Sequence, residues 1–324
     1  MGQGRGGPEE EMKPLEYLFL FLVFPGFLFS SVSGLVVGWI DRKVTAMVQW
    51  RVGPPWYQNF VDVAKLLLYK ETLIPKGVSS AFFLGMPVLA LSSATLASTI
   101  IFTANAGSRS GFIGDVIVVV YLLMIPAIAL MLGAFSSANT LATLGASREM
   151  KLMMAYELPF ILALLAVIVK TGYALKLGGI MSYQIASGST IGNWSGLLSF
   201  VTMILCVQAK LGFVPFDMPE AETEIMGGTY IEYSGKALGI FKLSKAVMLF
   251  AVPALMVILY FGGIKFDGLR AFLGSIGQYV AILVIMILIK NTNPRVRIDQ
   301  AMKFFWGPVT LLGLVSIILA IMGK

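Results

Sequence analysis

The stretch KLGFVPFDMPEAETEIMGGTYIEYSGK, residues 210–236, places a cluster of carboxylates between two long apolar runs. Its five acids make up nearly a third of the 17 acidic residues in the chain. They are Asp217, Glu220, Glu222, Glu224 and Glu232. An acid at hydrocarbon depth costs roughly 2.5–3.5 kcal/mol even on a lenient insertion scale, so a membrane protein that carries this many is expected to use them. We expect them to hold and pass protons or cations.

The local sequence of this stretch predicts a broken entry and then a short helix from Glu220, because Pro215 and Pro219 lie just before it. In such a helix Glu220 and Glu224 share a face, and Glu222 points away. Two carboxylates at this spacing repel each other when both are ionised, so one of them is expected to keep its proton if partly buried. A fully solvated acidic loop is the alternative, and the apolar neighbours of the acids argue against it.

The composition of the whole chain is that of a membrane protein. Apolar residues make up 57% of the 324 residues and charged residues 13%, with a mean hydropathy of +0.85. These values exclude an ordinary soluble globule. The net charge of +7 is expected to reflect cytoplasmic loops, since no basic cluster alternates with aromatic residues as in nucleic-acid-binding proteins.

The chain has no histidine and one cysteine, Cys206, which lies inside an apolar run. The absence of histidine excludes a histidine-ligated haem, a typical zinc site and a histidine general base. A single cysteine cannot by itself hold an iron–sulfur cluster. We therefore expect this chain to bind no cofactor, and any electrons to travel in a different subunit.

Length and hydropathy predict an all-α integral membrane protein with about eight transmembrane helices, in one polytopic domain over residues 1–324. A polar tail over residues 1–15 precedes the first span. The predicted spans are roughly 17–40, 80–105, 112–135, 152–171, 194–213, 243–262, 271–290 and 304–322.

Basic residues indicate the orientation of the chain. The odd-numbered connections and their flanks hold most of the 24 lysines and arginines. The positive-inside rule therefore predicts that these connections face the cytoplasm and that both termini lie outside. We expect the membrane to be the cell membrane. The acidic stretch 210–236 is the fifth connection and faces the cytoplasm in this topology.

The first connection, residues 41–76, is too long for a plain loop. Within it, the sequence NFVDVAKLLLYKE separates apolar from charged residues, which predicts an amphipathic interfacial helix after the first span. Its predicted apolar side consists of Phe60, Val63, Leu66, Leu67 and Leu68. The preceding RVGPPW predicts a rigid turn that could shape a cavity wall. A membrane-surface helix without any chemistry is the alternative.

Glu157 lies one to two turns inside the fourth predicted span and is followed by Pro159. An ionisable residue at this depth is a functional candidate by default. The alternative places Glu157 in the headgroup region, paired with Lys151 or Arg148.

Six motifs, in this order, resemble one family closely: the heel (H-type) subunit of respiratory complex I and its counterpart in membrane-bound energy-converting [NiFe] hydrogenases, such as the M-type subunit of the archaeal enzymes. The resemblance covers most of the chain between residues 41 and 306. The motifs are DRKVTAMVQWRVGPP, KETLIP, AYELPF, VPFDMPEAETEI, YIEYSG and PRVRIDQAMKFFW.

The resemblance implies roles for the acids and for the first connection. In the family, the counterparts of one set of residues line a polar channel that leads away from the redox module. This proton path is Glu157, Glu220, Glu222, Glu224 and Glu232, with Asp62 and Glu71 near its mouth. A second set would border a cavity that faces the iron–sulfur subunit and admits quinone in complex I. These residues are Arg42, Gln49, Arg51 and Asp217.

The resemblance also implies partners: peripheral iron–sulfur and hydrogenase-large-type subunits, antiporter-like membrane subunits and the lipid bilayer. Iron–sulfur clusters and a NiFe centre are expected in those partners. The compact GPPWYQNF after the first span, and Asp41–Arg42 in place of the usual Glu-Arg, depart from complex I. They favour a ferredoxin-driven complex that reduces protons or sulfur compounds over one that reduces quinone.

Two other classes of protein fit less of the sequence. A stand-alone secondary transporter is expected to show two related halves with broken helices at matching positions, and no such repeat is visible. A purely structural membrane anchor does not need acids inside the membrane.

Overall fold

The computed structural model describes residues 14–106, 114–266 and 268–323, and every regular element in these ranges is helical. Most of the predicted tail, residues 1–15, lies outside the described residues. The elements are α1 (Pro14–Leu22), α2 (Phe27–Val48), α3 (Gln58–Ala64), η1 (Lys65–Tyr69), α4 (Ser80–Ala106), α5 (Asp115–Leu122), α6 (Ile125–Ser136), α7 (Thr140–Lys170), α8 (Leu177–Ser187), η2 (Thr190–Gly192), α9 (Trp194–Lys210), η3 (Met218–Glu220), α10 (Glu222–Ile225), η4 (Gly228–Tyr230), α11 (Gly235–Phe261), α12 (Leu269–Thr292), α13 (Ile298–Phe304), η5 (Phe305–Val309) and α14 (Thr310–Ile321).

Within these ranges, seven helical stretches are long and apolar enough to cross a membrane, and α9 is a shorter apolar helix. Together they correspond to the eight predicted spans. The prediction of an all-α membrane protein is therefore confirmed.

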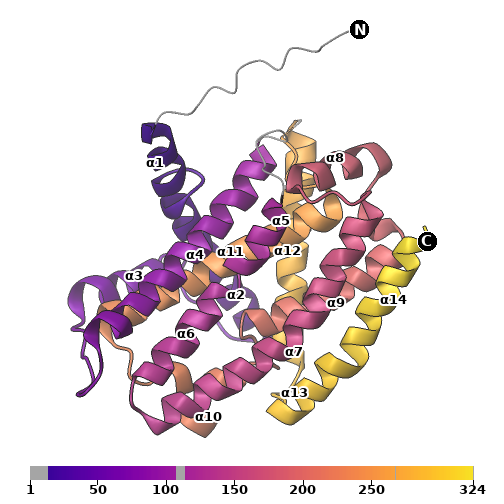
Figure 1. Ribbon diagram of the computed structural model, residues 1–324. Helices are drawn as coiled ribbons and strands as arrows, with labels where there is room; N and C mark the ends of the chain where they lie inside the picture. Colours follow the sequence, from indigo (N-terminus) through magenta and orange to yellow (C-terminus); the bar gives the residue numbers. More distant parts are fainter. Residues whose placement is uncertain (1–13, 107–113, 267, 324) are drawn as a thin grey trace.

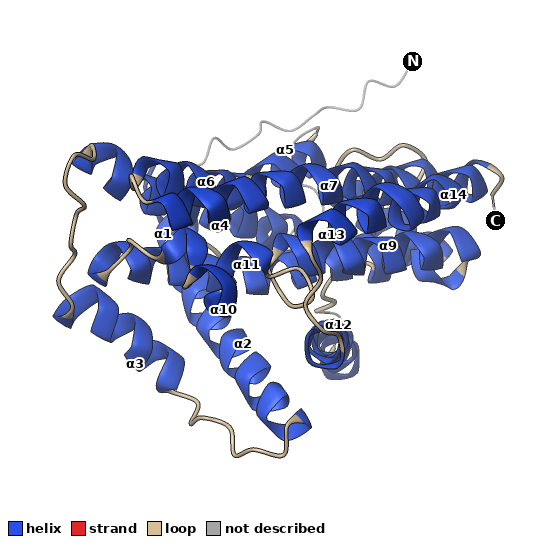
Figure 2. Ribbon diagram, turned by 90° about the horizontal axis from the view of Figure 1, so that it is seen from below, coloured by secondary structure: helices blue, strands red, loops and turns tan. Residues whose placement is uncertain are grey.

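Helix α11 lies at the centre of the bundle, with α2, α4 and α12 packed around it (Figure 1). Most of its residues are buried, because its sequence is apolar on nearly every side. Gly34 of α2 permits a close approach, since a Cβ at that position would lie 2.5 Å from the backbone oxygen of Ala246 in α11. On the other side of the bundle α7 packs against α6, α9 and α14, whereas α2 and α3 extend away from this layer (Figure 2).

The odd-numbered connections meet at one end of the bundle. Hydrogen bonds join the fifth connection to the first, third and seventh: Leu73 N to Ser234 Oγ at 2.9 Å, Asn139 Nδ2 to Glu232 Oε1 at 2.5 Å, and Val296 N to Pro215 O at 3.2 Å. The predicted alternation of the spans therefore agrees with the way the chain folds.

Two predicted spans are broken by prolines. The span predicted over 17–40 is divided near Pro25 into α1 and α2, and α2 continues to Val48, into the predicted first connection. The span predicted over 112–135 is divided into α5 and α6, with Pro126 in the first turn of α6. Proline lacks the backbone N–H that would continue the preceding helix, so each break has a local cause.

Two other predicted spans begin too late. The span predicted over 152–171 begins at Thr140, because the side chain of Asn139 accepts a hydrogen bond from the Leu141 N–H at 2.8 Å and caps the helix there. Helix α11 begins at Gly235, eight residues before its predicted start. Helix α8 occupies the stretch between α7 and α9, where the sequence shows no strong helical pattern.

The predicted amphipathic helix is present as α3 followed by the π-helical turn η1. Val63 and Leu66 are buried as predicted, and Val63 packs with Leu35 and Leu243. Leu68, which is predicted on the apolar side, is instead 75% exposed. Leu68 follows Val63 by five residues, which at 3.6 residues per turn is roughly 140° around the helix axis, so its side chain points away from the buried side.

Candidate functional site

The fifth connection between α9 and α11, residues 211–234, forms an acidic loop. It runs through three short helical turns and changes direction at Met226, Gly227 and Gly228, which all have positive φ. The prediction of one helix starting at Glu220 is wrong. Glu220 ends the turn η3, and α10 begins at Glu222 after one extended residue.

Glu220 and Glu224 therefore do not share a helix face, and they bind different cations. The Nζ of Lys245, on α11, donates to both carboxylate oxygens of Glu220 at 2.7 Å. The Nη1 of Arg148, on α7, donates to Glu224 at 2.6 Å. Each acid is neutralised by its own base, so the predicted mutual repulsion within one helix does not apply.

Asp217 anchors the acidic loop to the connection between α12 and α13. Arg295 donates to it from Nε at 2.8 Å and from Nη2 at 2.5 Å, which is a two-pronged ion pair. This bonding to Asp217 raises the pKa of the Arg295 guanidinium, which stays charged. Asp217 thus holds the loop in place and does not line the cavities described below.

Glu157 and Lys210 form an ion pair between α7 and α9. The Lys210 Nζ lies 3.3 Å from Glu157 Oε2, and the lysine side chain is fully buried. The same ammonium lies 4.4 Å from the centre of the Phe160 ring, which gives it a second favourable contact. The predicted alternative, a pairing of Glu157 with Lys151 or Arg148, is wrong.

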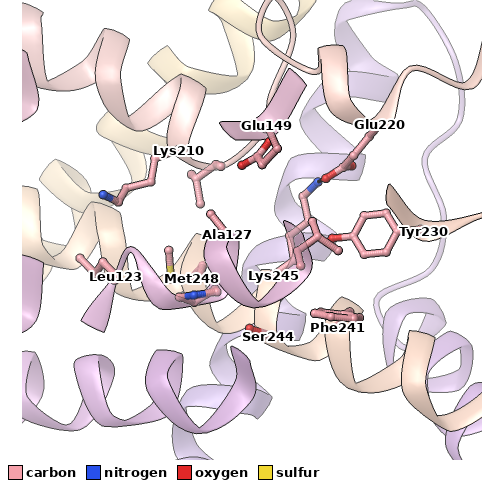
Figure 3. A pocket seen from close by; sticks show the side chains of 14 residues that line it. Leu123, Ala127, Glu149, Lys210, Glu220, Tyr230, Phe241, Ser244, Lys245 and Met248 are labelled. Atoms are coloured by element: carbon pink, nitrogen blue, oxygen red, sulfur yellow. Dashed lines mark hydrogen bonds and ion pairs between the residues drawn. The ribbon is translucent and has the colours of Figure 1, made fainter. Parts of the chain in front are cut away.

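A small cavity, called the inner cavity, lies between α6, α7, α9 and α11 and the acidic loop (Figure 3). The space open to the centres of water molecules is about 60 Å³, which is room for several waters. Its polar and ionisable lining residues are Glu149, Lys210, Glu220, Tyr230, Ser244 and Lys245. Burial and the nearby carboxylates raise the pKa of Tyr230 well above its usual value, so its phenol stays neutral.

Glu149 is a cavity residue that the sequence does not single out. It lies on α7, is 8% exposed, and has no hydrogen bond or ion pair within the described part of the chain. The fourth predicted span starts after it, which leaves it in a loop. The apolar residues before Glu149 are the signal that could have extended the predicted span back to include it.

A larger cavity, called the outer cavity, opens between the first connection and the acidic loop. The space open to water centres there is about 470 Å³. Its charged and polar lining residues are Asp41, Arg42, Asn59, Asp62, Glu220, Glu222, Tyr230, Lys242 and Lys245. Arg42 pairs with Asp62 at 2.9 Å, and Asp41 pairs with Lys290 at 2.8 Å. The structure thus brings four of the predicted site residues together: Arg42, Asp62, Glu220 and Glu222.

The two cavities share four lining residues: Leu211, Glu220, Tyr230 and Lys245. Polar groups therefore continue from the first connection, through the acidic loop, to the interior of the bundle. Lys210 extends the row, because it lines the inner cavity and pairs with Glu157.

Other predicted site residues lie outside both cavities. Gln49 donates to Asn291 at 3.3 Å on the surface, and Arg51 is exposed. Glu71 lines a separate surface groove beside α4 and α11. Glu232 accepts a hydrogen bond from Asn139 at the junction of the third and fifth connections. Glu224 also lies outside, with half of its side chain exposed.

Metal-ligand types do not gather in the described residues. No group of three or more His, Cys, Asp or Glu side chains is arranged there to hold a metal ion. Cys206 is buried in α9 as a free thiol.

Comparisons with known proteins match this chain to membrane subunits of respiratory complexes. A family model described as NADH dehydrogenase matches residues 20–321. The H-type subunit of NADH-quinone oxidoreductase from Brevibacillus brevis is 30% identical over 313 residues, which cover 92% of this chain and 91% of the relative. Its namesake from Geobacillus thermodenitrificans is 31% identical, with 93% and 90% covered. A chain of the membrane-bound sulfane sulfur reductase, an archaeal respiratory membrane complex, superposes with a TM-score of 0.83 at 30% identity, over 94% of this chain and 99% of that chain.

Proposed function

Because this chain belongs to the NADH dehydrogenase family, as an H-type membrane subunit of a complex I-like oxidoreductase, we propose that it anchors the redox module of its complex and couples the redox reaction to movement of protons or sodium ions. The observation that supports the proposal is a row of ionisable groups that runs from the outer cavity, through the inner cavity, to the buried ion pair of Glu157. This row is Asp62, Glu220, Lys245, Glu149, Lys210 and Glu157.

The first connection supports the anchoring role. It exposes large apolar side chains at the end of the bundle where the odd-numbered connections meet, and Trp50 and Val52 are 96% and 98% exposed. Exposed apolar groups of this size outside a span are typical of a surface covered by another subunit. We assign that surface to the peripheral iron–sulfur and hydrogenase-large-type subunits, and the lateral helix faces to antiporter-like membrane subunits and lipid.

The orientation follows from the same end of the molecule. Most of the basic residues lie in the odd-numbered connections and the helix segments that flank them, and the hydrogen bonds described above hold these connections together. By the positive-inside rule, this distribution supports a cytoplasmic location for this end, with both termini outside the cell membrane.

The terminal electron acceptor has two candidates beside quinone. The compact first connection favours a ferredoxin-driven complex of the hydrogenase type, which reduces protons. The match to a chain of the sulfane sulfur reductase complex favours a sulfur compound instead. Supplying the purified complex with reduced ferredoxin and, in turn, protons, polysulfide or a quinone analogue distinguishes the three.

The coupling role is tested with Glu220→Gln in the intact complex, reconstituted in lipid vesicles that contain a pH-sensitive dye. We expect the complex to assemble, and ion movement per electron to fall sharply, because glutamine keeps the shape of the side chain but cannot exchange a proton. Asp299→Asn is the matched control, since Asp299 lines neither cavity. Unchanged ion movement in Glu220→Gln would contradict the proposal.

A further inference from the structure

We propose that Lys245 is a switch that exchanges its ion pair between Glu220 and Glu149, and that Glu149 is the carboxylate that receives the proton on the inner side. This inference rests on the proposed coupling function and names the residues that control passage between the two cavities. Glu149 lies outside the acidic stretch, and its role comes from where α7 places it.

The wall between the cavities is the first observation. Of its four residues, Leu211 is apolar and Tyr230 stays neutral, so Glu220 and Lys245 are the charged groups at this point. Both oxygens of Glu220 are held by the Lys245 ammonium at 2.7 Å. A proton that moves from the outer to the inner cavity through protein groups must therefore pass this ion pair.

The surroundings of Glu149 are the second observation. Its charged neighbours are Glu220 and Lys245, and it has no bonded partner among the described residues. Burying a carboxylate without a partner is expensive, so the starting state of the proposed switch has a proton on Glu149. It becomes a stable anion when an ammonium turns toward it, and Lys245 lines the same small cavity as Glu149.

Lysine is suited to such an exchange. Its ammonium is carried on a flexible stem of four carbons, and Lys245 lines both cavities with about a third of its side chain accessible to solvent. Figure 3 shows Glu220 and Glu149 approaching this region from different elements, the acidic loop and α7. Lys210 already pairs with Glu157, and Lys242 lines the outer cavity one turn before Lys245.

The proton balance closes over one cycle. At the start Glu220 is an anion paired with Lys245, and Glu149 is neutral. A proton from the outer cavity neutralises Glu220 and releases Lys245, which then pairs with Glu149 as the proton of Glu149 leaves into the waters of the inner cavity. The proton on Glu220 then passes to Glu149, and Lys245 returns to Glu220. One proton has crossed, and the net charge of the three groups is zero at the start and at the end.

The test compares variants of the intact complex in dye-loaded vesicles, driven by the donor and acceptor that support turnover. Glu149→Gln is expected to reduce ion movement about 100-fold, the lower end of what a positioned proton-transfer group contributes. Glu149→Asp keeps an acid at the site and is expected to retain part of the movement. If Glu220→Gln stops ion movement and Glu149→Gln does not, the switch is wrong and the coupling function stands; if neither variant stops it, both are wrong.

An infrared measurement on the resting complex gives a readout that does not depend on turnover. A protonated carboxylic acid has a carbonyl band distinct from that of a carboxylate, and Glu149 is expected to contribute one. The band should disappear in Glu149→Gln, move in Glu149→Asp and remain in Asp299→Asn. A spectrum of Glu149→Gln identical to that of the wild type would overturn the assignment of a neutral Glu149.

Discussion

Replacing Lys210 with methionine tests whether the buried ion pair in the interior is held by mutual neutralisation. The lysine side chain is 0% exposed and that of Glu157 is 13% exposed, so the substitution leaves a carboxylate with almost no access to water. Its Oε1 already has no hydrogen-bond partner among the described residues. Removing one member of a buried ion pair costs about 3–5 kcal/mol, and the lost contact with the Phe160 ring adds about 1 kcal/mol.

A double-mutant cycle isolates the ion pair from other effects. In Lys210→Met/Glu157→Leu both charges are replaced by apolar groups, which is often neutral or stabilising by about 1–4 kcal/mol. We therefore expect the double variant to be more stable than Lys210→Met and more stable than Glu157→Leu. The assay is thermal unfolding of the purified complex at one pH and in one detergent. If the loss of stability in the double variant equals the sum of the single losses, the two groups are not coupled and the reasoning is refuted.

Two further predictions concern the position of the acidic loop. Gly145→Ala should destabilise the complex by about 1–3 kcal/mol and weaken coupling, because the added Cβ would lie 2.8 Å from the backbone nitrogen of Thr229. The control is Gly85→Ala, which should not destabilise the complex, because no atom lies within 4 Å of its added Cβ. Arg295→Gln should increase hydrogen exchange in the acidic loop, because it removes the two-pronged bond to Asp217. Lys303→Gln, at an exposed position nearby, should leave the exchange unchanged, and equal exchange in the two variants would contradict the anchoring role of Asp217.

The positions of the spans could be predicted because hydropathy is a local property of the sequence. The ends of the helices could not, since several are set by residues far along the chain. Helix α11 is an example: it starts at Gly235, whose φ is +52° and where a Cβ would lie 2.4 Å from the backbone oxygen of Glu71. The preceding residue, Ser234, accepts a hydrogen bond from the Leu73 N–H. Both contacts come from the first connection, and no local pattern indicates them.

The acids of the site could be predicted because carboxylates are rare in this chain. Their partners could not, since each base lies on a different element. Lys245 follows Glu220 by 25 residues, and Lys210 follows Glu157 by 53. Glu149 has no distinctive motif, and its importance comes from burial beside Glu220 and Lys245.

The zero net charge of the proposed switch determines how strongly a distant redox event can move a proton through it. Because Glu220, Lys245 and Glu149 together carry no net charge, the position of one proton depends on small differences in potential. A unit charge added about 12 Å away changes the energy of a carboxylate by about 1.4 kcal/mol at an effective dielectric constant of about 20, which is roughly tenfold in proton occupancy. At about 30 Å the effect falls to about 0.6 kcal/mol, or less than threefold. Coupling through this row therefore requires the charge change to occur close to the outer cavity, which the first connection lines with Asn59 and Asp62.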